Sequence, residues 1–570
     1  MRSSFFTTIL TTTALTLATA GAAYAYDIID TISSDGSNTT SFQQYGDAVG
    51  NNSIRSTQGG KNNEATGVQF GNQNSVAIDQ AGAAAPAAAL PWWYAYWYPS
   101  VWAAHNAAQA TGQNNTVGFS QNGGDNRINI KQSGTKLNAT VNQEGYGNMY
   151  TGTQIGTGHK AAVTAFGNRN VVVTNQNAGS NSTATVTTTG NNNTLTVVQK
   201  TATNNVGEIV ANGDRNIGTI ESDGTNNKAN MRIVGNDNTS KIIQKAGSSN
   251  NSVTSNITGG GFNDNTATQS GTSSSITINN TGSGNKVTAM QGTGSNNTAV
   301  VTTKGFDNVV NISADMVTGV LGNFNEAKVT NYGSSNAVNV FQHGNGLNTA
   351  GVTIGTTSSN ASGNTVNIDQ VSIAPVVRRA SPGATVNIGA NSNDNSVTMY
   401  QNGLWNYGTV DIKAGSNSNT VQTSQLGTSH NVGVTVIGNY NDAKVTQGGT
   451  ANTANVSLLG YGAHSAVINQ TAGSSQVANI RATGAGTSST ITQTGVSNNA
   501  SITDSGQYNV IDVKQIANNN NATISNMGNN NVIALQQAGG SKANITMSGA
   551  NVGKTISLIQ PANSIVTISR

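Results

Sequence analysis

The segment Gly528–Gly539, GNNNVIALQQAG, decides the fold of this 570-residue chain, because close relatives of it recur along most of the sequence. Asn531, Ile533, Leu535 and Gln537 are two residues apart, so they fall on one face of a β-strand. The apolar pair marks that face as the buried one, and two side-chain amides are buried with it. A buried amide without a partner costs on the order of 1–3 kcal/mol, so the fold must supply partners for both.

Glycine marks a repeat of eleven residues. Counting from each Gly, the third residue is often Asn, the fifth and seventh are small or apolar, and the ninth is often Gln. The Gly, Asn and Asp residues between units suit tight turns, so the pattern predicts strands joined by turns and does not fit a helix. Two runs of glycines eleven residues apart show the period: Gly123, Gly134, Gly145, Gly156 and Gly167, and Gly427, Gly438, Gly449 and Gly460.

The Gln position adds a second period of 22 or 23 residues, because the intervening half-repeats usually carry another residue there, such as Leu458 or Ile524. Two unlike half-repeats therefore make one turn of about 22 residues, and stacked turns form an all-β solenoid of two parallel sheets facing each other across a thin core. Stacked amides can then hydrogen-bond from turn to turn, as in cross-β assemblies. The predicted ladder residues are Asn126, Asn531, Gln425, Gln447, Gln470, Gln493, Gln515, Gln537 and Gln560.

Composition argues against a conventional globular enzyme, because only 9% of the residues are charged and 5% are aromatic, while Gly numbers 67. Disorder is disfavoured as well, since Pro numbers only 6 and β-branched residues are plentiful. A net charge of +3 is too small to attract nucleic acid strongly. The absence of Cys excludes disulfides and metal–thiolate sites.

The first 25 residues have the features of a secretory signal peptide. Arg2 precedes an uncharged run at residues 5–22, and Ala23–Ala25 forms a small-x-small cleavage site. We therefore expect residues 1–25 to be removed, the mature chain to begin at Tyr26, and the protein to be exported.

The nine-residue segments NRINIKQSG, from Asn126, and NVIALQQAG, from Asn531, share an Asn, five intervening residues, Gln, one residue and Gly. This pattern resembles the curlin repeat of bacterial curli subunits, and it covers residues 26–82 and 109–570. The resemblance implies a self-associating extracellular functional amyloid of the biofilm matrix, exported through the curli outer-membrane channel. It leaves open whether the chain is a major subunit, a nucleator or an adhesin.

Residues 83–108 interrupt the repeat with a segment rich in Trp, Tyr and Pro. A transmembrane helix is disfavoured by three Pro residues and by aromatics at its centre. Two interpretations stay open: a flap that covers a sheet face, and a docking surface for lipid headgroups, sugar or another subunit. A shorter interruption at 371–383 is predicted to be a solvated loop. The candidate docking residues are Trp92, Trp93, Tyr94, Tyr96, Trp97, Tyr98 and Trp102.

Signals for catalysis or metal binding are weak. His159 and His430 stand where the repeat usually has Asn, so we interpret them as replacements for Asn rather than as metal ligands. Asp125, Asp237 and Asp307 immediately precede that position, where Asp suits a turn. The Thr-rich segment 183–190 is explained by strand propensity better than by ice or sugar binding. We expect no enzymatic activity, no metal site and no cofactor.

These inferences predict a secreted structural protein, a curli-like fibre or matrix component for cell adhesion and biofilm formation, located outside the cell or on its surface. Assembly would occur by edge-to-edge stacking, because the end turns of a solenoid expose unpaired strand edges. The segment NSIVTISR at 563–570 alternates like one more strand, with only Arg570 resembling a charge that discourages stacking. The alternative is a monomeric rod-shaped surface adhesin that binds a glycan or lipid surface through the aromatic insertion.

Overall fold

The computed structural model describes residues 28–34, 38–45, 52–80, 113–315, 325–344, 348–372, 383–549 and 552–569. These residues form two compact units, divided between Ser270 and Gly271. The signal peptide predicted at 1–25, the aromatic insertion at 83–108 with its candidate docking residues, most of the loop at 371–383, and Arg570 lie outside the described residues. All the described secondary structure is β, and no helix occurs in it.

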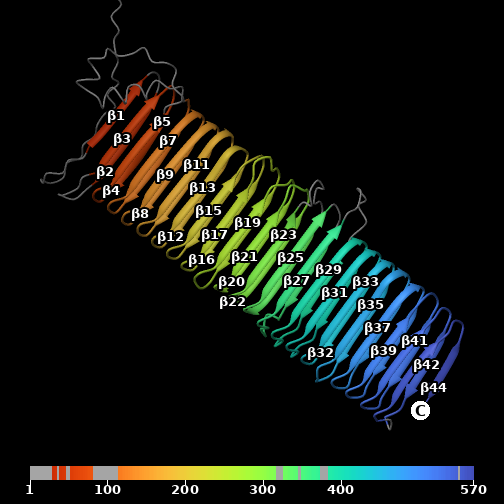
Figure 1. The fold of residues 1–570 in the computed structure, drawn as a ribbon. Helices are drawn as coiled ribbons and strands as arrows, with labels where there is room; N and C mark the ends of the chain where they lie inside the picture. The colour runs from red at the N-terminus through yellow and green to blue at the C-terminus, as the bar shows by residue number, and fades with distance from the viewer. Residues whose placement is uncertain are drawn as a thin grey trace, which may run out of the picture. The chain divides into compact units, whose positions relative to one another are not determined.

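The first unit contains two parallel sheets, and the chain alternates between them strand by strand (Figure 1). Odd-numbered strands pair with odd-numbered strands, and even with even, in sequence order. The odd-numbered sheet comprises β1 (Ile28–Ser34), β3 (Ser53–Gly59), β5 (Ser75–Gln80), β7 (Arg127–Thr135), β9 (Met149–Thr157), β11 (Val171–Ser180), β13 (Thr194–Thr203), β15 (Ile217–Ser222), β17 (Thr239–Gln244) and β19 (Asp264–Gln269). The even-numbered sheet comprises β2 (Thr39–Tyr45), β4 (Glu64–Phe70), β6 (Thr116–Asn122), β8 (Asn138–Glu144), β10 (Lys160–Phe166), β12 (Thr183–Thr189), β14 (Val206–Asn212), β16 (Lys228–Val234) and β18 (Ser252–Thr258).

The second unit repeats this arrangement with parallel pairing throughout. Its even-numbered sheet comprises β20 (Ser275–Ser283), β22 (Thr298–Phe306), β24 (Glu326–Ser334), β26 (Thr349–Ile354), β28 (Gly383–Ile388), β30 (Tyr407–Ile412), β32 (Asn431–Ile437), β34 (Thr453–Leu459), β36 (Val477–Ala482), β38 (Asn499–Asp504), β40 (Asn521–Asn526), β42 (Lys542–Met547) and β44 (Ile565–Ser569). Its odd-numbered sheet comprises β21 (Lys286–Gln291), β23 (Val309–Asp315), β25 (Ala337–Gly344), β27 (Thr365–Ser372), β29 (Ser396–Leu404), β31 (Thr420–Thr428), β33 (Asp442–Thr450), β35 (Ser465–Ser474), β37 (Ser488–Val496), β39 (Val510–Gln515), β41 (Val532–Gln537) and β43 (Thr555–Gln560).

The predicted fold class is confirmed: in each unit two parallel sheets form a β-solenoid, with about 20 turns in all and roughly 23 residues per turn. One turn is an odd strand, a connecting arc, an even strand and a second arc. The turns exceed the expected 22 residues where arcs carry extra residues, so that Gln342 and Gln370 are 28 apart and Gln370 and Gln401 are 31 apart. The strands themselves keep their register, because the inward residues must stay aligned.

The strands whose side chains the structure describes turn mainly small and β-branched side chains toward the core, which lies between the two sheets. In β41, for example, Ile533 and Leu535 are buried while Val532 and Gln536 point outward. The largest fully buried side chain is Tyr150, which fits because Gly152 has no side chain to meet its hydroxyl group. That hydroxyl lies 2.7 Å from the Thr174 Oγ1, so its polar end has a partner.

Glycine is required in the arcs because successive turns approach each other closely. Gly145 has φ of 114°, and a Cβ there would meet the carbonyl oxygen of Gly167 in the next turn. We expect Gly145→Ala to destabilise its unit by about 1–3 kcal/mol, measured as a lower urea midpoint for loss of the strand signal. Gly118→Ala is the control, because its Cβ would lie 3.9 Å from the nearest atom, the Thr66 Oγ1. Equal losses for the two variants would contradict this account.

Candidate functional site

The seven predicted glutamines form one continuous inward row on the odd-numbered strands of the second unit. The Nε2 of each donates to the Oε1 of the next, and the six N–O distances from Gln425 to Gln560 are 3.1, 2.9, 2.8, 2.7, 2.8 and 2.7 Å. The row also extends backward through Gln401 and Gln370 to Gln342, and its members are buried. We call this row the glutamine ladder.

The glutamine ladder also ties the two sheets together. The Nε2 of Gln493 donates to the Val477 carbonyl oxygen on the facing strand at 2.9 Å, as well as to the next glutamine. Gln537 makes the equivalent bond to the Asn521 carbonyl oxygen at 2.9 Å. Both hydrogens and the oxygen of Gln493 and of Gln537 are therefore used inside the core, which offsets the cost of burying these amides.

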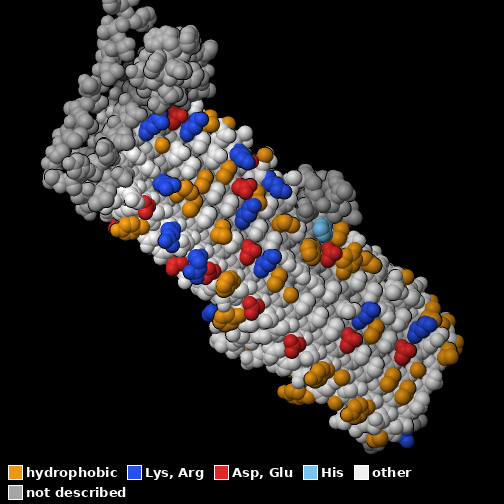
Figure 2. Space-filling model, turned by 60° about the vertical axis from the view of Figure 1, so that its left-hand side comes forward, with side chains coloured by type: hydrophobic (Ala, Val, Ile, Leu, Met, Phe, Trp, Pro, Cys, Tyr) orange, Lys and Arg blue, Asp and Glu red, His pale blue; other side chains and the backbone are white. Residues whose placement is uncertain are grey.

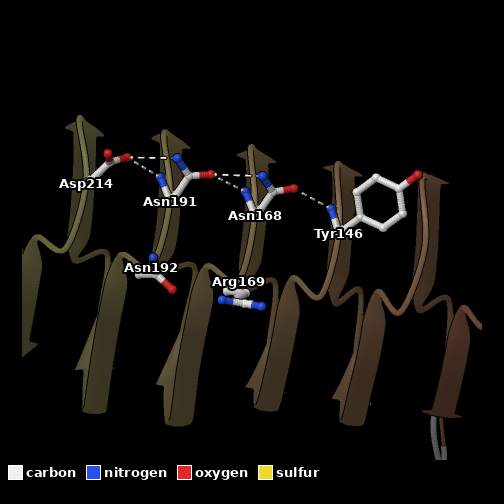
Figure 3. Close-up of a pocket in the computed structure, with 6 residues that line it drawn as sticks. All are labelled: Tyr146, Asn168, Arg169, Asn191, Asn192 and Asp214. Carbon is white, nitrogen blue, oxygen red and sulfur yellow. Dashed lines mark hydrogen bonds between the residues drawn. The ribbon is translucent and has the colours of Figure 1, made fainter.

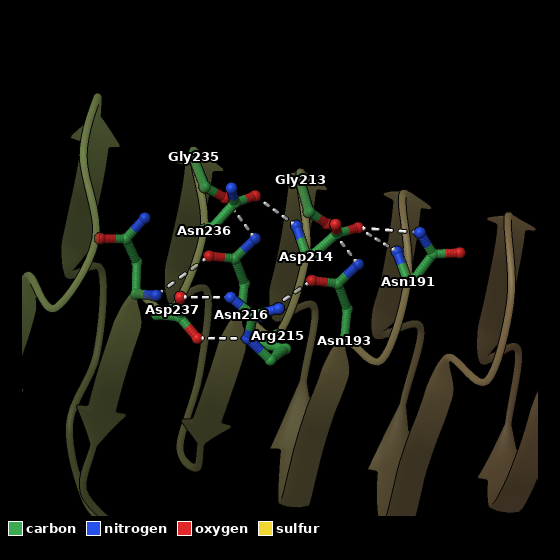
Figure 4. A network of polar contacts seen from close by, with 10 residues as sticks. Asn191, Asn193, Gly213, Asp214, Arg215, Asn216, Gly235, Asn236 and Asp237 are labelled. Atoms are coloured by element: carbon green, nitrogen blue, oxygen red, sulfur yellow. Dashed lines mark hydrogen bonds and ion pairs between the residues drawn. The ribbon is translucent and has the colours of Figure 1, made fainter.

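The asparagine positions lie in the arcs and bond differently. Asn126 Oδ1 accepts the backbone N–H of Asn148 in the next turn at 3.0 Å, and its Nδ2 donates to the Gly145 carbonyl oxygen at 2.8 Å. Figure 4 shows the same arrangement at Asn193 and Asn216, whose Nδ2 atoms donate to glycine carbonyl oxygens at 2.7 Å. These rows hold the arcs in register through the backbone.

The two predicted asparagines stand at equivalent arc positions, each before an odd-numbered strand, in different units. Asn126 lies in the first unit, in the arc before β7, and Asn531 lies in the second, in the arc before β41. Asn531 accepts the backbone N–H of Lys554 at 2.8 Å and donates from Nδ2 to the Asn526 Oδ1 at 3.1 Å.

On the even-numbered strands of the second unit, the Gln position holds different residues. Leu458 occupies this position in β34, as predicted. The prediction that Ile524 occupies it in β40 was wrong, because Asn526 is the residue that aligns there with Asp504 of β38. Asp504 is a buried carboxylate whose Oδ1 accepts from the Gly506 N–H at 3.2 Å and from the Nδ2 of Asn509 at 2.9 Å and of Asn526 at 3.1 Å. Burial raises its pKa, and these hydrogen bonds partly oppose the rise. Counting eleven residues from Gln493 could have found it.

Three buried histidines replace asparagines in the arcs. His159 and His430 do so as predicted, and His464 is a third that the sequence reasoning missed, because its arc has one extra residue after Gly460. The His464 backbone N–H donates to the Asn441 Oδ1 at 3.1 Å, as an asparagine at this position would. Burial lowers the pKa of all three imidazoles, with bonds to backbone groups partly opposing this. Among the described residues, no three His, Asp or Glu side chains are placed to hold a metal ion.

The aspartates that precede the asparagine positions adopt left-handed backbone conformations. Asp125, Asp237 and Asp307 have φ of 56°, 56° and 53°, which supports their interpretation as turn residues. Asp237 also forms a bidentate ion pair with Arg215, with N–O distances of 2.6 and 2.7 Å (Figure 4). The pair lowers the pKa of the Asp237 carboxyl group and raises that of Arg215.

A second polar row follows the outside of the first unit's arcs, and sequence reasoning did not single it out. The backbone N–H of Tyr146 donates to the Asn168 Oδ1 at 2.9 Å, and the Asn168 Nδ2 donates to the Asn191 Oδ1 at 3.1 Å (Figure 3). Asn191 in turn donates from Nδ2 to the Asp214 Oδ1 at 3.1 Å. The available signal was the Asn or Asp that directly follows the arc glycine.

The turn made by β43 and β44 is open on one side, because no described strand pairs with its outer edge. Its inward side chains Val566 and Ile568 are only half-buried, whereas Ile533 in the preceding turn of the odd-numbered sheet is fully buried. Gln560 accepts from Gln537 and donates from Nε2 to the Lys542 carbonyl oxygen at 2.7 Å. Within the described chain, its second Nε2 hydrogen has no acceptor, so the glutamine ladder ends on an unused donor.

Two residues of this open turn differ from the repeat. Lys554 holds the Asn position, so the arc lacks the amide oxygen that would receive a further backbone N–H. Pro561 follows Gln560 and has no N–H, although the equivalent Ala538 N–H donates to the Gln560 carbonyl oxygen at 3.0 Å. Both differences weaken the edge as a template, as charges and prolines do on sheet edges in general.

The visible surface carries few charges. Figure 2 shows Lys, Arg, Asp and Glu side chains scattered singly or in small mixed groups rather than gathered in a patch of one sign. Exposed apolar residues at the open turn include Ile559 and Ile565, each 74% exposed. The part of the chain that the structure describes has no helix long and apolar enough to cross a membrane.

Comparison with known protein families matches residues 417–449 to the curlin-associated repeat. This stretch includes β31, β32 and most of β33, and it contains Gln425 and Gln447, two successive members of the glutamine ladder. The resemblance inferred from the sequence is confirmed there. No curated protein matches the chain.

Proposed function

From the curlin-associated repeat at residues 417–449, we propose that this chain is a secreted, non-enzymatic structural protein of curli-like extracellular fibres that support adhesion and biofilm formation. The repeat and the β-solenoid fit a curli-like structural fibre protein. Secretion rests on the predicted signal peptide, and N-terminal sequencing of the exported protein is expected to begin at Tyr26. Export through a curli-type outer-membrane channel follows from the resemblance.

The observation that carries the proposal is the open turn. In the second unit, each turn before this one is covered in register by the turn that follows it, and that contact buries its inward residues. At β43 and β44 the same inward positions, the backbone edge and the Gln560 Nε2 remain uncovered in the described chain. A second copy of this chain is the partner that fits, because a further turn of the same repeat supplies matching strands and a Gln oxygen at the right position.

The experiment places a charge on this edge. Ile568→Lys is expected to slow fibre growth by at least tenfold, because stacking would bury the ammonium group without a partner. In the unstacked protein the side chain is only half-buried, so the variant is expected to fold. Thr567→Lys is the matched control, since Thr567 points outward on the same strand and its growth rate should stay close to that of the unmodified chain.

Growth is followed by amyloid-dye fluorescence and electron microscopy of the mature protein seeded with its own fibres. Equal growth of the two variants would remove the open turn from the mechanism. Unmodified protein that stays monomeric at high concentration, without cross-β diffraction, would overturn the fibre proposal in favour of the monomeric surface adhesin.

A further inference from the structure

A shallow groove of about 460 Å³ lies along the outside of four successive arcs in the first unit. Its lining is Tyr146, Asn168, Arg169, Asn191, Asn192 and Asp214 (Figure 3). The fibre proposal makes no use of this groove, which lies on the side of the stack rather than at an open end.

Two glycines lie beside the groove. Gly124 stands in the arc before Tyr146, and a Cβ there would lie 2.9 Å from the tyrosine ring, so the ring leans over the space that a side chain would fill. Gly147 stands one turn before Arg169 at the same arc position, and a Cβ there would lie 3.5 Å from the Arg169 Cγ. The tyrosine ring is 65% exposed despite this contact, and it therefore offers one face to solvent.

The polar side chains of the groove are held in place by the outer row of hydrogen bonds. Asn168 and Asn191 each use Oδ1 and one Nδ2 hydrogen within the row, which leaves the second Nδ2 hydrogen of each for a ligand. Asp214 accepts from Asn191 through Oδ1, so its Oδ2 can accept from a hydroxyl group. These groups are pre-organised, which lowers the entropic cost of binding.

Arg169 supplies an unneutralised charge. Arg215 occupies the same arc position two turns away, but its guanidinium is paired with Asp237. Within the described residues Arg169 has no carboxylate partner, because Gly147 and Asn192 hold the same arc position in the two adjacent turns. A guanidinium beside an exposed aromatic ring and fixed amides suits a ligand with a carboxylate, a flat ring face and several hydroxyl groups.

We infer that this groove binds an acidic polysaccharide, with a uronate carboxylate on Arg169, a sugar ring on the face of Tyr146, and hydroxyl groups on Asn168, Asn191 and Asp214. The turns are spaced about 4.8 Å apart, so an extended polymer lying along the stack meets a new arc at each step. Binding of this kind would attach the protein to an anionic glycan independently of how its ends associate.

The test is calorimetric titration of the mature chain with an alginate hexamer, with cellohexaose as the uncharged comparison. The unmodified chain is expected to bind the uronate oligomer at least tenfold more tightly than cellohexaose. Arg169→Gln is expected to reduce uronate affinity by about tenfold or more, and Tyr146→Asn to weaken binding of both oligomers. Both variants use residues that the arcs already accept, because Gln73 has φ of 59° at the position of Arg169, and Asn follows the arc glycine at Asn168.

Two controls separate a site from general charge attraction. Arg215→Gln removes a guanidinium at the equivalent arc position, and Lys160→Gln removes an exposed charge on the outer face of β10. Both are expected to bind the alginate hexamer within about twofold of the unmodified chain. The inference is overturned if the unmodified chain does not bind the hexamer, if Arg169→Gln has no effect, or if either control loses as much affinity as Arg169→Gln.

Discussion

Replacing Gln537 by Leu is expected to destabilise the second unit by about 3–5 kcal/mol, although Leu is the more hydrophobic residue. The change leaves the Gln515 Nε2 without its acceptor and the Gln560 Oε1 without its donor. It also removes the bond to the Asn521 carbonyl oxygen on the facing strand. Each buried group that loses its partner costs about 1–3 kcal/mol, and the larger apolar surface of Leu offsets only part of this.

The neighbouring residue provides the control. Gln536 precedes Gln537 in β41, but its side chain points outward. Gln536→Leu therefore makes the same chemical change on the outer face and should alter stability by no more than about 0.5 kcal/mol. Hydrogen exchange of the β39, β41 and β43 amides measures the difference where it arises, which is preferable in a repeat protein that need not unfold in one step. Equal effects of the two substitutions would show that the glutamine ladder contributes nothing beyond strand formation.

Acidification is expected to destabilise both units through the buried histidines. In the folded chain burial lowers the imidazole pKa, so the unfolded state binds more protons. The stability that these groups contribute is present above the unfolded value of about 6.5 and is lost as the pH falls through that value to the lower folded pKa. With two such groups, His430 and His464, the second unit can lose up to about 2.7 kcal/mol per pH unit, and His159 alone accounts for up to about half of that in the first.

The hydrogen bonds explain why protonation is unfavourable. The Nδ1 of His159 accepts the Ser182 N–H at 3.2 Å, and the Nδ1 of His430 accepts the Asn452 N–H at 3.4 Å. A protonated Nδ1 would turn each contact into two donors facing each other. Burial raises the pKa of several aspartates, including Asp504, so their contribution is largest at low pH and is lost as the pH rises through the raised value. At the acidic end of the pH range, the stability gained from these protonated aspartates opposes the loss caused by the histidines.

A triple substitution tests this prediction. His159→Asn, His430→Asn and His464→Asn together restore the residue that the repeat uses elsewhere, and urea midpoints between pH 7 and 5 should then vary much less than in the unmodified chain. His343→Asn is the control, because the His343 side chain is 28% exposed and lies outside the asparagine rows. If the triple variant keeps the full acid sensitivity, the buried imidazoles are not its source.

Much of the fold could be predicted from residue spacing. The two-residue spacing of Asn531, Ile533, Leu535 and Gln537 predicts a strand with amides on its buried face, and the return of Gln at 22 or 23 residues predicts two unlike strands per turn. Such local periods survive in the structure because a one-residue slip would expose the apolar side chains of a whole strand. Because the register is kept, Leu458 lies at the Gln position of β34, as its spacing predicted. Ile524 was misplaced, because the count along that half-repeat was two residues short of Asn526.

The partners of the amides depended on three-dimensional distance, which spacing does not encode. The longer Gln side chain bonds the next Gln inside the core. The shorter Asn side chain lies in an arc and bonds backbone groups of the next turn. His464 became recognisable only through its buried position in the asparagine row, whereas counting eleven residues from Gln493 already reaches Asp504.

The sequence by itself determined the strand period, the two-sheet solenoid and the glutamine ladder, because each depends on residues at regular intervals along one chain. Only the tertiary structure decided that Tyr146, Arg169 and Asp214 line one groove, and that among the described residues one Nε2 hydrogen of Gln560, beside Pro561, has no acceptor. The physical reason is that stacking brings residues about 22 positions apart to within one strand spacing, about 4.8 Å. The chemistry of the surface is therefore set by which arcs become neighbours.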